Sequence, residues 1–367
     1  MPFCARRCPY CDFATAPLAA AVERRYLAAL AVEAAARLPD GFRPRTVFFG
    51  GGTPTELTTD GVARLVELLG PACGEALEVT LEANPRTLLP RKLRALRAGL
   101  GVGRVSLGVQ SFQPKLLETL GRFHRADDVA RAVAICRDEG VRDVSLDLIF
   151  AVPGQTEDDL ARDLDAALAL APDHLSAYGL TVEEGTTYGD LRKAGRLVEL
   201  GDRRQARMYG LVRRRLRAAG FQHYEVSSFA RPGRRCRHNR VYWRNHPYVG
   251  LGNAAASHLG GARLVNHRDV AAYCAAIEAG GGAAAVASSE ALEAPRKVRE
   301  TAYLAMRTSR GLDPVRFRKD AGVDAHAALG PELDKLVQDG LVLVRDGRWV
   351  LTGRGVALAD AVGAALL

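Results

Sequence analysis

Residues 4–13 read Cys-Ala-Arg-Arg-Cys-Pro-Tyr-Cys-Asp-Phe, which places Cys4, Cys8 and Cys11 in a C-x3-C-x2-C spacing. Three thiolates on one short loop can hold three irons of a four-iron cluster, and the fourth iron is then open to a small molecule. A structural zinc site needs four protein ligands, usually in paired units, and a secreted disulfide framework uses many cysteines in a much shorter chain. The spacing therefore favours an iron–sulfur cluster, with zinc or plain structural cysteines as the alternatives.

Length and composition are those of an ordinary globular protein. The 367 residues, 48% hydrophobic and 25% charged, predict one large domain and one small one. We find no apolar run long enough to span a bilayer and no secretory signal, so we expect a cytoplasmic protein. The other cysteines are scattered, as reduced buried thiols would be: Cys73, Cys136, Cys236 and Cys274.

The net charge of +9 raises the question of an anionic partner. Almost all of the positive charge is Arg, with only six Lys, in a chain that is also rich in Ala. This pattern is typical of a compositional bias spread over helix faces. We therefore expect no nucleic-acid partner.

Short β-branched runs alternate with longer helical patterns from about residue 18 to residue 220. The expected strands are Thr46–Phe49, Leu77–Leu81, Arg104–Gln110, Val144–Phe150 and His174–Thr181. This order is typical of parallel βαβ units. With a sixth strand expected around the cysteine loop, residues 1–220 predict an α/β fold with a partial (β/α)6 barrel, in which chemistry sits at the carboxyl ends of the strands.

The remainder of the chain predicts a connecting region, 221–278, and a smaller domain, 290–367. Residues 279–289 (AGGGAAAVASS) are small enough for a linker. In the C-terminal domain, helices precede a hairpin whose turn is Asp346-Gly347. This α+β order resembles a winged helix, which can bind DNA or serve as a packing element. One further helix, Arg203–Ala219, places Met208, Leu211, Val212 and Leu216 on one side.

Polar residues follow the expected strands at their carboxyl ends. They are Gly51, Gly52 and Thr53 after the first strand, Glu82 in the second, Gln110 in the third and Asp147 in the fourth, with Arg122 nearby. Each residue alone is as well explained by a solvated loop or a helix cap. Beside an open cluster iron, the set fits a ligand with an amine, a carboxylate and a ribose, and S-adenosylmethionine (SAM) is such a ligand.

The sequence resembles a known family, the radical SAM proteins related to oxygen-independent coproporphyrinogen dehydrogenase. The motifs are PFCARRCPYCDF, FFGGGTPT, EANPRT, VSLGVQSFQPKLLETLGRFHR, SLDLIFAVPGQT and YEVSSFARPGRRCRHNRVYW. The resemblance covers nearly the whole chain. It implies that Cys4, Cys8 and Cys11 bind a 4Fe-4S cluster, and that SAM lies among Tyr10, Gly51, Gly52, Thr53, Glu82, Gln110, Arg122 and Asp147.

Two features resemble the branch of HemW-type heme chaperones. Cys11 is followed by Asp12-Phe13, where the dehydrogenase branch continues C-x-C, and residues 238–243 read His-Asn-Arg-Val-Tyr-Trp. This HNxxYW pattern implies a heme site at His238, Tyr242 and Trp243, with His238 as the ligand of the heme iron. On chemistry alone, the segment is a basic aromatic loop, and an isolated His is more often structural than a ligand. His246 and His258 are alternative ligands.

The chain departs from the family pattern in three places, one of which is the late Gly-Ala-His element: it appears as Ala-Ala-Ala-Ser-His at 254–258, which weakens the case for His258 as a ligand. Only Met1-Pro2-Phe3 precede Cys4, so we expect a truncated first strand, which a misplaced start codon would explain. The usual Gly-Leu-Pro-Gly-Gln-Thr appears as Ala-Val-Pro-Gly-Gln-Thr at 151–156.

The leading hypothesis is a radical SAM heme chaperone that passes heme to acceptor apoproteins such as respiratory hemoproteins. The alternative is an enzyme that decarboxylates coproporphyrinogen III oxidatively, and a third is a DNA-binding regulator. The sequence leaves open whether SAM is cleaved or only held, and whether the chain forms a homodimer. It also leaves open a transient contact with membrane-bound acceptors.

Overall fold

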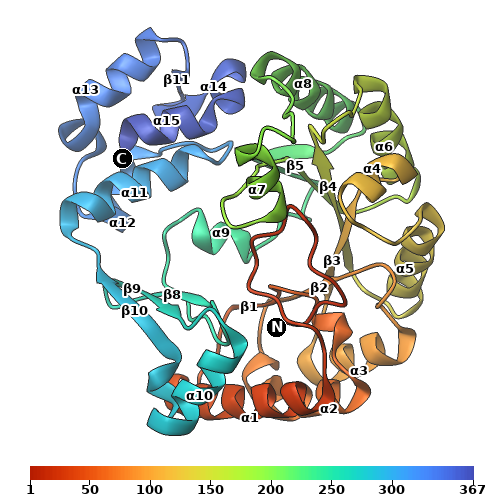
Figure 1. Cartoon of the computed structure of the whole chain (residues 1–367). Coiled ribbons are helices and arrows are strands. Elements are labelled where there is room, and N and C mark those ends of the chain that lie inside the picture. Colours follow the sequence, from red (N-terminus) through yellow and green to blue (C-terminus); the bar gives the residue numbers. More distant parts are fainter.

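The computed structural model describes residues 1–367 and is built around one curved seven-stranded sheet, ordered β1-β2-β3-β4-β5-β7-β6. The first five strands are parallel. Their bounds are β1 (Thr46–Phe49), β2 (Glu78–Ala83), β3 (Arg104–Gln110), β4 (Asp143–Phe150) and β5 (His174–Gly179). Figure 1 shows this sheet curled into an open half-barrel with helices around its outside. The α/β partial barrel is therefore confirmed.

The sheet is extended at one edge and not at the other. At the β5 edge, β7 (Ser228–Ala230) pairs antiparallel with β5, and β6 (Gln222–Glu225) pairs antiparallel with β7. At the β1 edge, the sixth strand expected around the cysteine loop is not formed, and Phe3 makes only an isolated bridge to Ala16. The prediction of that strand was wrong because the backbone of residues 1–3 bonds to the Gly50–Thr53 turn instead.

Helices link the parallel strands and cover the outer face of the sheet (Figure 1). They are α1 (Ala20–Arg37), α2 (Thr59–Cys73), α3 (Pro90–Leu100), α4 (Pro114–Thr119), α5 (Ala126–Asp138), α6 (Glu157–Ala169), α7 (Thr187–Lys193) and α8 (Asp202–Ala218), with a short 3-10 turn, η1 (Pro54–Glu56). In α6, Thr156 and Asp159 form a capping box, and Leu160, Leu164 and Ala167 are buried along one face. Helix α8 lies where we predicted a helix, with Met208, Val212 and Leu216 buried.

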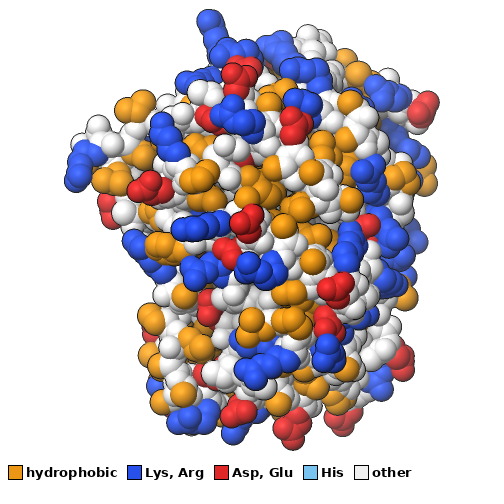
Figure 2. Space-filling view, turned by 90° about the vertical axis from the view of Figure 1, so that its right-hand side faces the viewer, with side chains coloured by type: hydrophobic (Ala, Val, Ile, Leu, Met, Phe, Trp, Pro, Cys, Tyr) orange, Lys and Arg blue, Asp and Glu red, His pale blue; other side chains and the backbone are white.

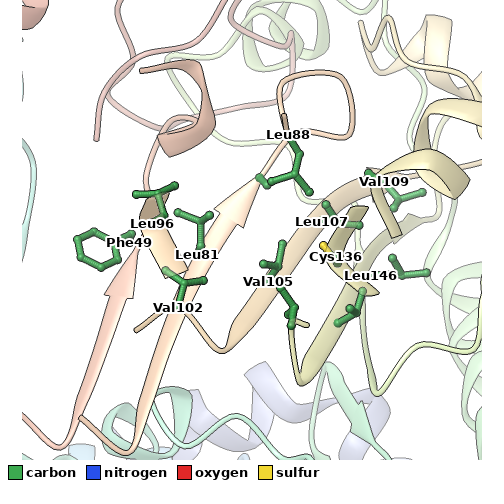
Figure 3. Close-up of a cluster of buried hydrophobic side chains, with 14 of the residues drawn as sticks. Phe49, Leu81, Leu88, Leu96, Val102, Val105, Leu107, Val109, Cys136 and Leu146 are labelled. Carbon is green, nitrogen blue, oxygen red and sulfur yellow. The ribbon is translucent and has the colours of Figure 1, made fainter. Parts of the chain in front are cut away.

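The main hydrophobic core lies between the sheet and these helices. Val105, Leu107 and Val109 alternate along β3 and are fully buried against side chains of neighbouring helices and strands (Figure 3). Because successive residues of a strand point to opposite faces, the intervening Ser106 and Gly108 face the inside of the half-barrel. The inner face is therefore free to carry polar side chains.

The connecting region packs against α1. It contains α9 (Asn239–Tyr242), most of α10 (Val270–Gly280) and the antiparallel strands β8 (Ala256–Leu259) and β9 (Ala262–Asn266), which β10 (Val286–Ala291) extends into a three-stranded sheet. Buried Glu33 of α1 accepts hydrogen bonds from Gly252 N (2.7 Å), Asn266 Nδ2 (2.7 Å) and Tyr273 Oη (2.6 Å). These contacts anchor the region to the barrel.

Residues 279–289 connect the two parts of the chain, but not as the flexible linker we expected. They contain the end of α10, a 3-10 turn η2 (Gly282–Ala285) and most of β10. A Cβ atom at Gly282 would collide with the backbone of Val32. The small residues here permit close packing against α1, which composition alone does not distinguish from flexibility.

The C-terminal domain has its own small core, which includes Met306, Leu333 and Val342. Its elements are α11 (Ala294–Met306), α12 (Pro314–Ala321), α13 (Ala325–Gln338), β11 (Val342–Arg345), β12 (Arg348–Leu351), α14 (Gly353–Ala357) and α15 (Ala359–Leu366). Asp346 and Gly347 have φ values of 51° and 70°, as a tight turn between the two strands requires. The predicted hairpin is present.

The surface over the outer helices mixes charges of both signs with hydrophobic side chains (Figure 2). No helix combines the length and the hydropathy that crossing a membrane requires.

Candidate functional site

A cavity of about 750 Å³ opens at the carboxyl ends of the parallel strands. It is lined by every residue that we expected around the cluster and SAM: Cys4, Cys8, Tyr10, Cys11, Gly51, Gly52, Thr53, Glu82, Gln110, Arg122 and Asp147. These residues come from the N-terminal loop, from β2, β3, β4 and the turn after β1, and, for Arg122, from the turn after α4. The topology therefore gathers them at one edge of the sheet, as a barrel predicts.

The three cysteines are free thiols on one loop of this cavity. Cys4 Sγ lies 3.5 Å from Thr53 Oγ1, Arg122 Nη1 lies 3.8 Å from Cys8 Sγ, and Cys11 N donates to Cys8 O (3.1 Å). No group of three or more His, Cys, Asp or Glu side chains converges as the ligands of one metal ion would. The thiols fit a cluster, because each thiolate then binds a different iron.

The glycine turn after β1 is shaped by close approach of residues 1–3. Gly51 has a φ of 102°, and a Cβ at Gly52 would lie 2.8 Å from the carbonyl of Pro2. The N–H groups of Gly51, Gly52 and Thr53 are taken by Glu82 Oε2 (3.1 Å), Met1 O (2.7 Å) and Phe3 O (2.8 Å). The turn can therefore offer carbonyl oxygens to a ligand, but not these N–H groups.

Two carboxyl groups lie at the floor of the cavity. Burial, and next the negative charge of Asp147, raise the pKa of Glu82 to about 7. Burial also raises the pKa of Asp147, against the effect of hydroxyl donors that include Ser106 Oγ (2.9 Å from Oδ2). Two carboxyl groups with raised pKa values would be stabilised by a cationic ligand, such as an ammonium group.

Gln110 and Arg122 lie together over Gly108. Gln110 has a φ of 66°, which is uncommon for a residue other than Gly, at a point where the β3–β4 register shifts. Arg122 Nη2 donates to Gly108 O (2.6 Å). Strain of this kind tends to collect where a side chain serves a ligand.

The lining also contains residues that we did not select, among them Ser106, His124 and Tyr178. His124 is buried, neither of its ring nitrogens has a hydrogen-bond partner, and burial lowers its pKa to about 4. Ser106 lies on the inner face of the half-barrel, as Gly108 does. Strand alternation after Arg104 would have found it, whereas no sequence signal marks the burial of His124.

The residues expected at heme lie outside this cavity, and they do not share one surface. His238 Nδ1 is 2.9 Å from Thr46 Oγ1, its Nε2 is 2.9 Å from Tyr242 Oη, and its ring stacks on Phe48 at 5.3 Å. Trp243 instead contacts Arg307, whose guanidinium lies 5.3 Å from the indole. His238 and Tyr242 thus form a pair, and Trp243 faces elsewhere.

Phe48, which stacks on His238, also lies close to Glu82 of the cavity. A Cβ at Gly50 would lie 2.5 Å from Phe48 Cε1 and 2.7 Å from Glu82 Oε2. The Phe48 ring and the Glu82 carboxyl group thus both lie beside Gly50.

Of the alternative ligands, His246 is half-buried and lies 4.0 Å from Asp320. His258 is 4% exposed, so its ring is poorly accessible to a macrocycle.

Comparison with known proteins places the chain in a family. Residues 1–167 match the radical SAM superfamily, and residues 292–358 match the HemN C-terminal domain. The chain is 39% identical over 375 residues to the heme chaperone HemW of Mycobacterium tuberculosis, covering 100% of this chain and 93% of that protein. The chain belongs to the HemW family of radical SAM proteins. The heme chaperone HemW of Bacillus subtilis is 33% identical, with 100% of this chain and 97% of that protein covered.

A solved structure supports the fold independently. Coproporphyrinogen III oxidase HemN of Escherichia coli superposes with a TM-score of 0.85 and 22% sequence identity, over 100% of this chain and 88% of that chain. At this identity the likeness concerns the fold. It extends over both the half-barrel and the C-terminal domain, so the two parts are arranged alike in this HemW family member and in HemN.

Proposed function

We propose that this protein binds heme through His238 and transfers it to acceptor apo-hemoproteins in the cytoplasm or at the membrane surface. The observation that carries the proposal is the state of His238 in a member of the HemW family. Burial lowers the pKa of the His238 imidazole to about 4, so the ring is neutral at physiological pH. The neutral imidazole is the form that ligates a metal.

The surroundings of His238 favour a ligand that can also be released. Both ring nitrogens are hydrogen-bonded, so iron can bind only after the bond to Thr46 or to Tyr242 is broken. Tyr242 is 37% exposed, whereas Thr46 belongs to the sheet. We therefore assign Nε2, which faces Tyr242, as the ligand atom. When heme leaves, re-forming the hydrogen bond between Nε2 and Tyr242 would stabilise the heme-free protein by about 1 kcal/mol.

The cavity is proposed to hold the other two cofactors. Cys4, Cys8 and Cys11 would hold the 4Fe-4S cluster, which when bound can supply an electron to the sulfonium of SAM. Glu82 and Asp147 would face the positive charge of SAM. Arg122 would compensate the negative charge of the Cys8 thiolate, from which it lies 3.8 Å. Tyr10, Gln110 and the carbonyls of Gly51 and Gly52 would complete the contacts.

Transfer of heme to an acceptor tests the function directly. The anaerobic, cluster-loaded protein is loaded with heme and mixed with an apo-cytochrome, and the acceptor's absorption spectrum is followed. We expect transfer faster than from free heme, and loss of that acceleration in His238→Ala. Transfer at the rate of free heme would contradict the proposal.

The same preparation distinguishes the enzymatic alternative. Incubated with coproporphyrinogen III, SAM and a reductant, the protein should form no protoporphyrinogen IX. Formation of this product in repeated turnovers would replace the chaperone with a decarboxylating enzyme.

A further inference from the structure

A second, smaller cavity lies between α9 and the C-terminal domain. Its volume is about 130 Å³, and Trp243 lines it. We call it the arginine groove, after the charged residues in its lining: Arg235, Arg240, Arg244, Arg310, Arg316, Asp313 and Asp320. Arg240 of α9 and Arg244, two residues after α9, line the groove, whereas His238 does not. The groove is therefore separate from the proposed heme ligand.

The two acids of the groove are already paired. Asp313 accepts from Arg310 (3.1 Å) and from Arg348 (3.0 Å). Asp320 is 3.1 Å from Arg316 and 4.0 Å from His246. Each acid therefore already has cationic partners, and Arg310 and Arg316 of the groove are among them.

Three arginines are left without an acidic partner. Arg235 donates only to the amide oxygen of Gln222 (3.0 Å), and neither Arg240 nor Arg244 makes a side-chain hydrogen bond or an ion pair. Arg240 and Arg244 are half-buried. The groove therefore gathers positive charge that the chain itself does not neutralise.

The pKa shifts of Arg240 and Arg244 agree with an excess of positive charge in the groove. Burial, followed by the charges of Arg235 and Arg316, lowers the pKa of Arg240. Burial, followed by Arg316 and Arg240, lowers the pKa of Arg244 to about 10. The indole N–H of Trp243 is also buried without a hydrogen-bond acceptor. An anion in the groove would compensate the positive charge and would accept a hydrogen bond from the indole N–H.

We propose that the arginine groove binds a small phosphate-type dianion, either inorganic phosphate or a phosphate monoester. Arginine recognises phosphate through paired N–H donors, and a dianion suits three uncompensated cations better than a single carboxylate does. The ligand would join Arg240 of α9 and Arg244, which follows α9, to Arg316 of α12 in the C-terminal domain.

The size of the ligand is set by the surrounding cavity. Arg244 also lines an adjoining cavity of about 160 Å³, which contains Lys297. Lys297 makes no ion pair. The substituent of a phosphate ester could therefore extend from the groove into this space.

The test is calorimetric titration of the full-length, cluster-loaded protein with inorganic phosphate at constant ionic strength. We expect saturable binding to one site per chain, weakened at least tenfold in Arg240→Gln/Arg244→Gln. The control, Arg203→Gln/Arg214→Gln, removes the same charge from the exposed face of α8 and should bind as the wild type does. Absence of saturable binding, or equal weakening in both double variants, would overturn the proposal.

Thermal unfolding gives a second readout that does not depend on the binding assay. Without phosphate, Arg240→Gln/Arg244→Gln should melt at a higher temperature than the wild type, because mutual repulsion is removed. With saturating phosphate the order should reverse. Heme or an acidic peptide that displaces phosphate would instead assign the groove to the heme site or to an acceptor protein, and either result would overturn a separate phosphate site.

Discussion

Glu82→Gln should make the stability of the cluster-free protein less dependent on pH. The pKa of Glu82 is raised from 4.5 to about 7, chiefly by burial. Between these values the folded state binds more protons than the unfolded state, so the free energy of unfolding falls as pH rises. Glutamine keeps an oxygen for the N–H of Gly51 but carries no charge to bury. The variant should therefore match the wild type near pH 4.5 and exceed it at pH 8.

The magnitude follows from the same pKa difference. One pKa unit corresponds to 1.36 kcal/mol, so the difference between 4.5 and about 7 gives at most about 3 kcal/mol. Glu82 is only half-buried and faces an open cavity, so solvent screening reduces the expected gain to about 1–2 kcal/mol at pH 8. Urea unfolding followed by circular dichroism measures it at several pH values. Glu75→Gln, at an exposed carboxyl, is the control. Parallel curves for Glu82→Gln and the wild type would refute the reasoning.

Three further substitutions test contacts that position the two sites. Asp163→Ala should lower the free energy of unfolding, measured with urea, by about 3 kcal/mol. The reason is that Ser111 Oγ (2.7 Å) and Phe112 N (2.8 Å) lose a buried acceptor. An effect as small as that of Asp165→Ala would contradict this. Arg122→Gln should lower the iron content after anaerobic reconstitution, since it removes the cation beside Cys8, and unchanged iron would count against that role. Glu78→Ala should weaken heme binding several-fold, because the backbone N–H groups of residues 237 and 238 lose the carboxylate that accepts from them. Glu78→Gln should be intermediate. Equal heme affinity in the wild type and both variants would show that Glu78 does not position His238.

Much of the barrel could be predicted because its signals are local. Each parallel strand is a short apolar or β-branched run, and the predicted and observed ends differ by at most two residues. Site residues follow these strands, and parallel strands end at one edge. Residues that follow different strands in the sequence are therefore neighbours in space. The cysteine spacing needed no structure at all.

What could not be predicted depends on contacts between distant segments. Thr46 and His238 are 192 residues apart, yet they share a hydrogen bond that restricts the proposed heme ligand. The sequence motif likewise places Trp243 beside Tyr242, while the α9 turn directs the indole to the arginine groove. Burial of His124 and the packing of Gly282 against α1 also arise only in the folded chain.

Anaerobic heme titration, followed at the Soret band, tests the central claim most directly. The wild type should bind one heme per chain, and His238→Ala should lose that binding. Tyr242→Phe removes the hydrogen bond that competes for Nε2, worth about 1 kcal/mol. It should therefore bind heme about fivefold more tightly, since 1.4 kcal/mol is tenfold. Equal binding by the wild type and a folded, cluster-loaded His238→Ala would contradict the account.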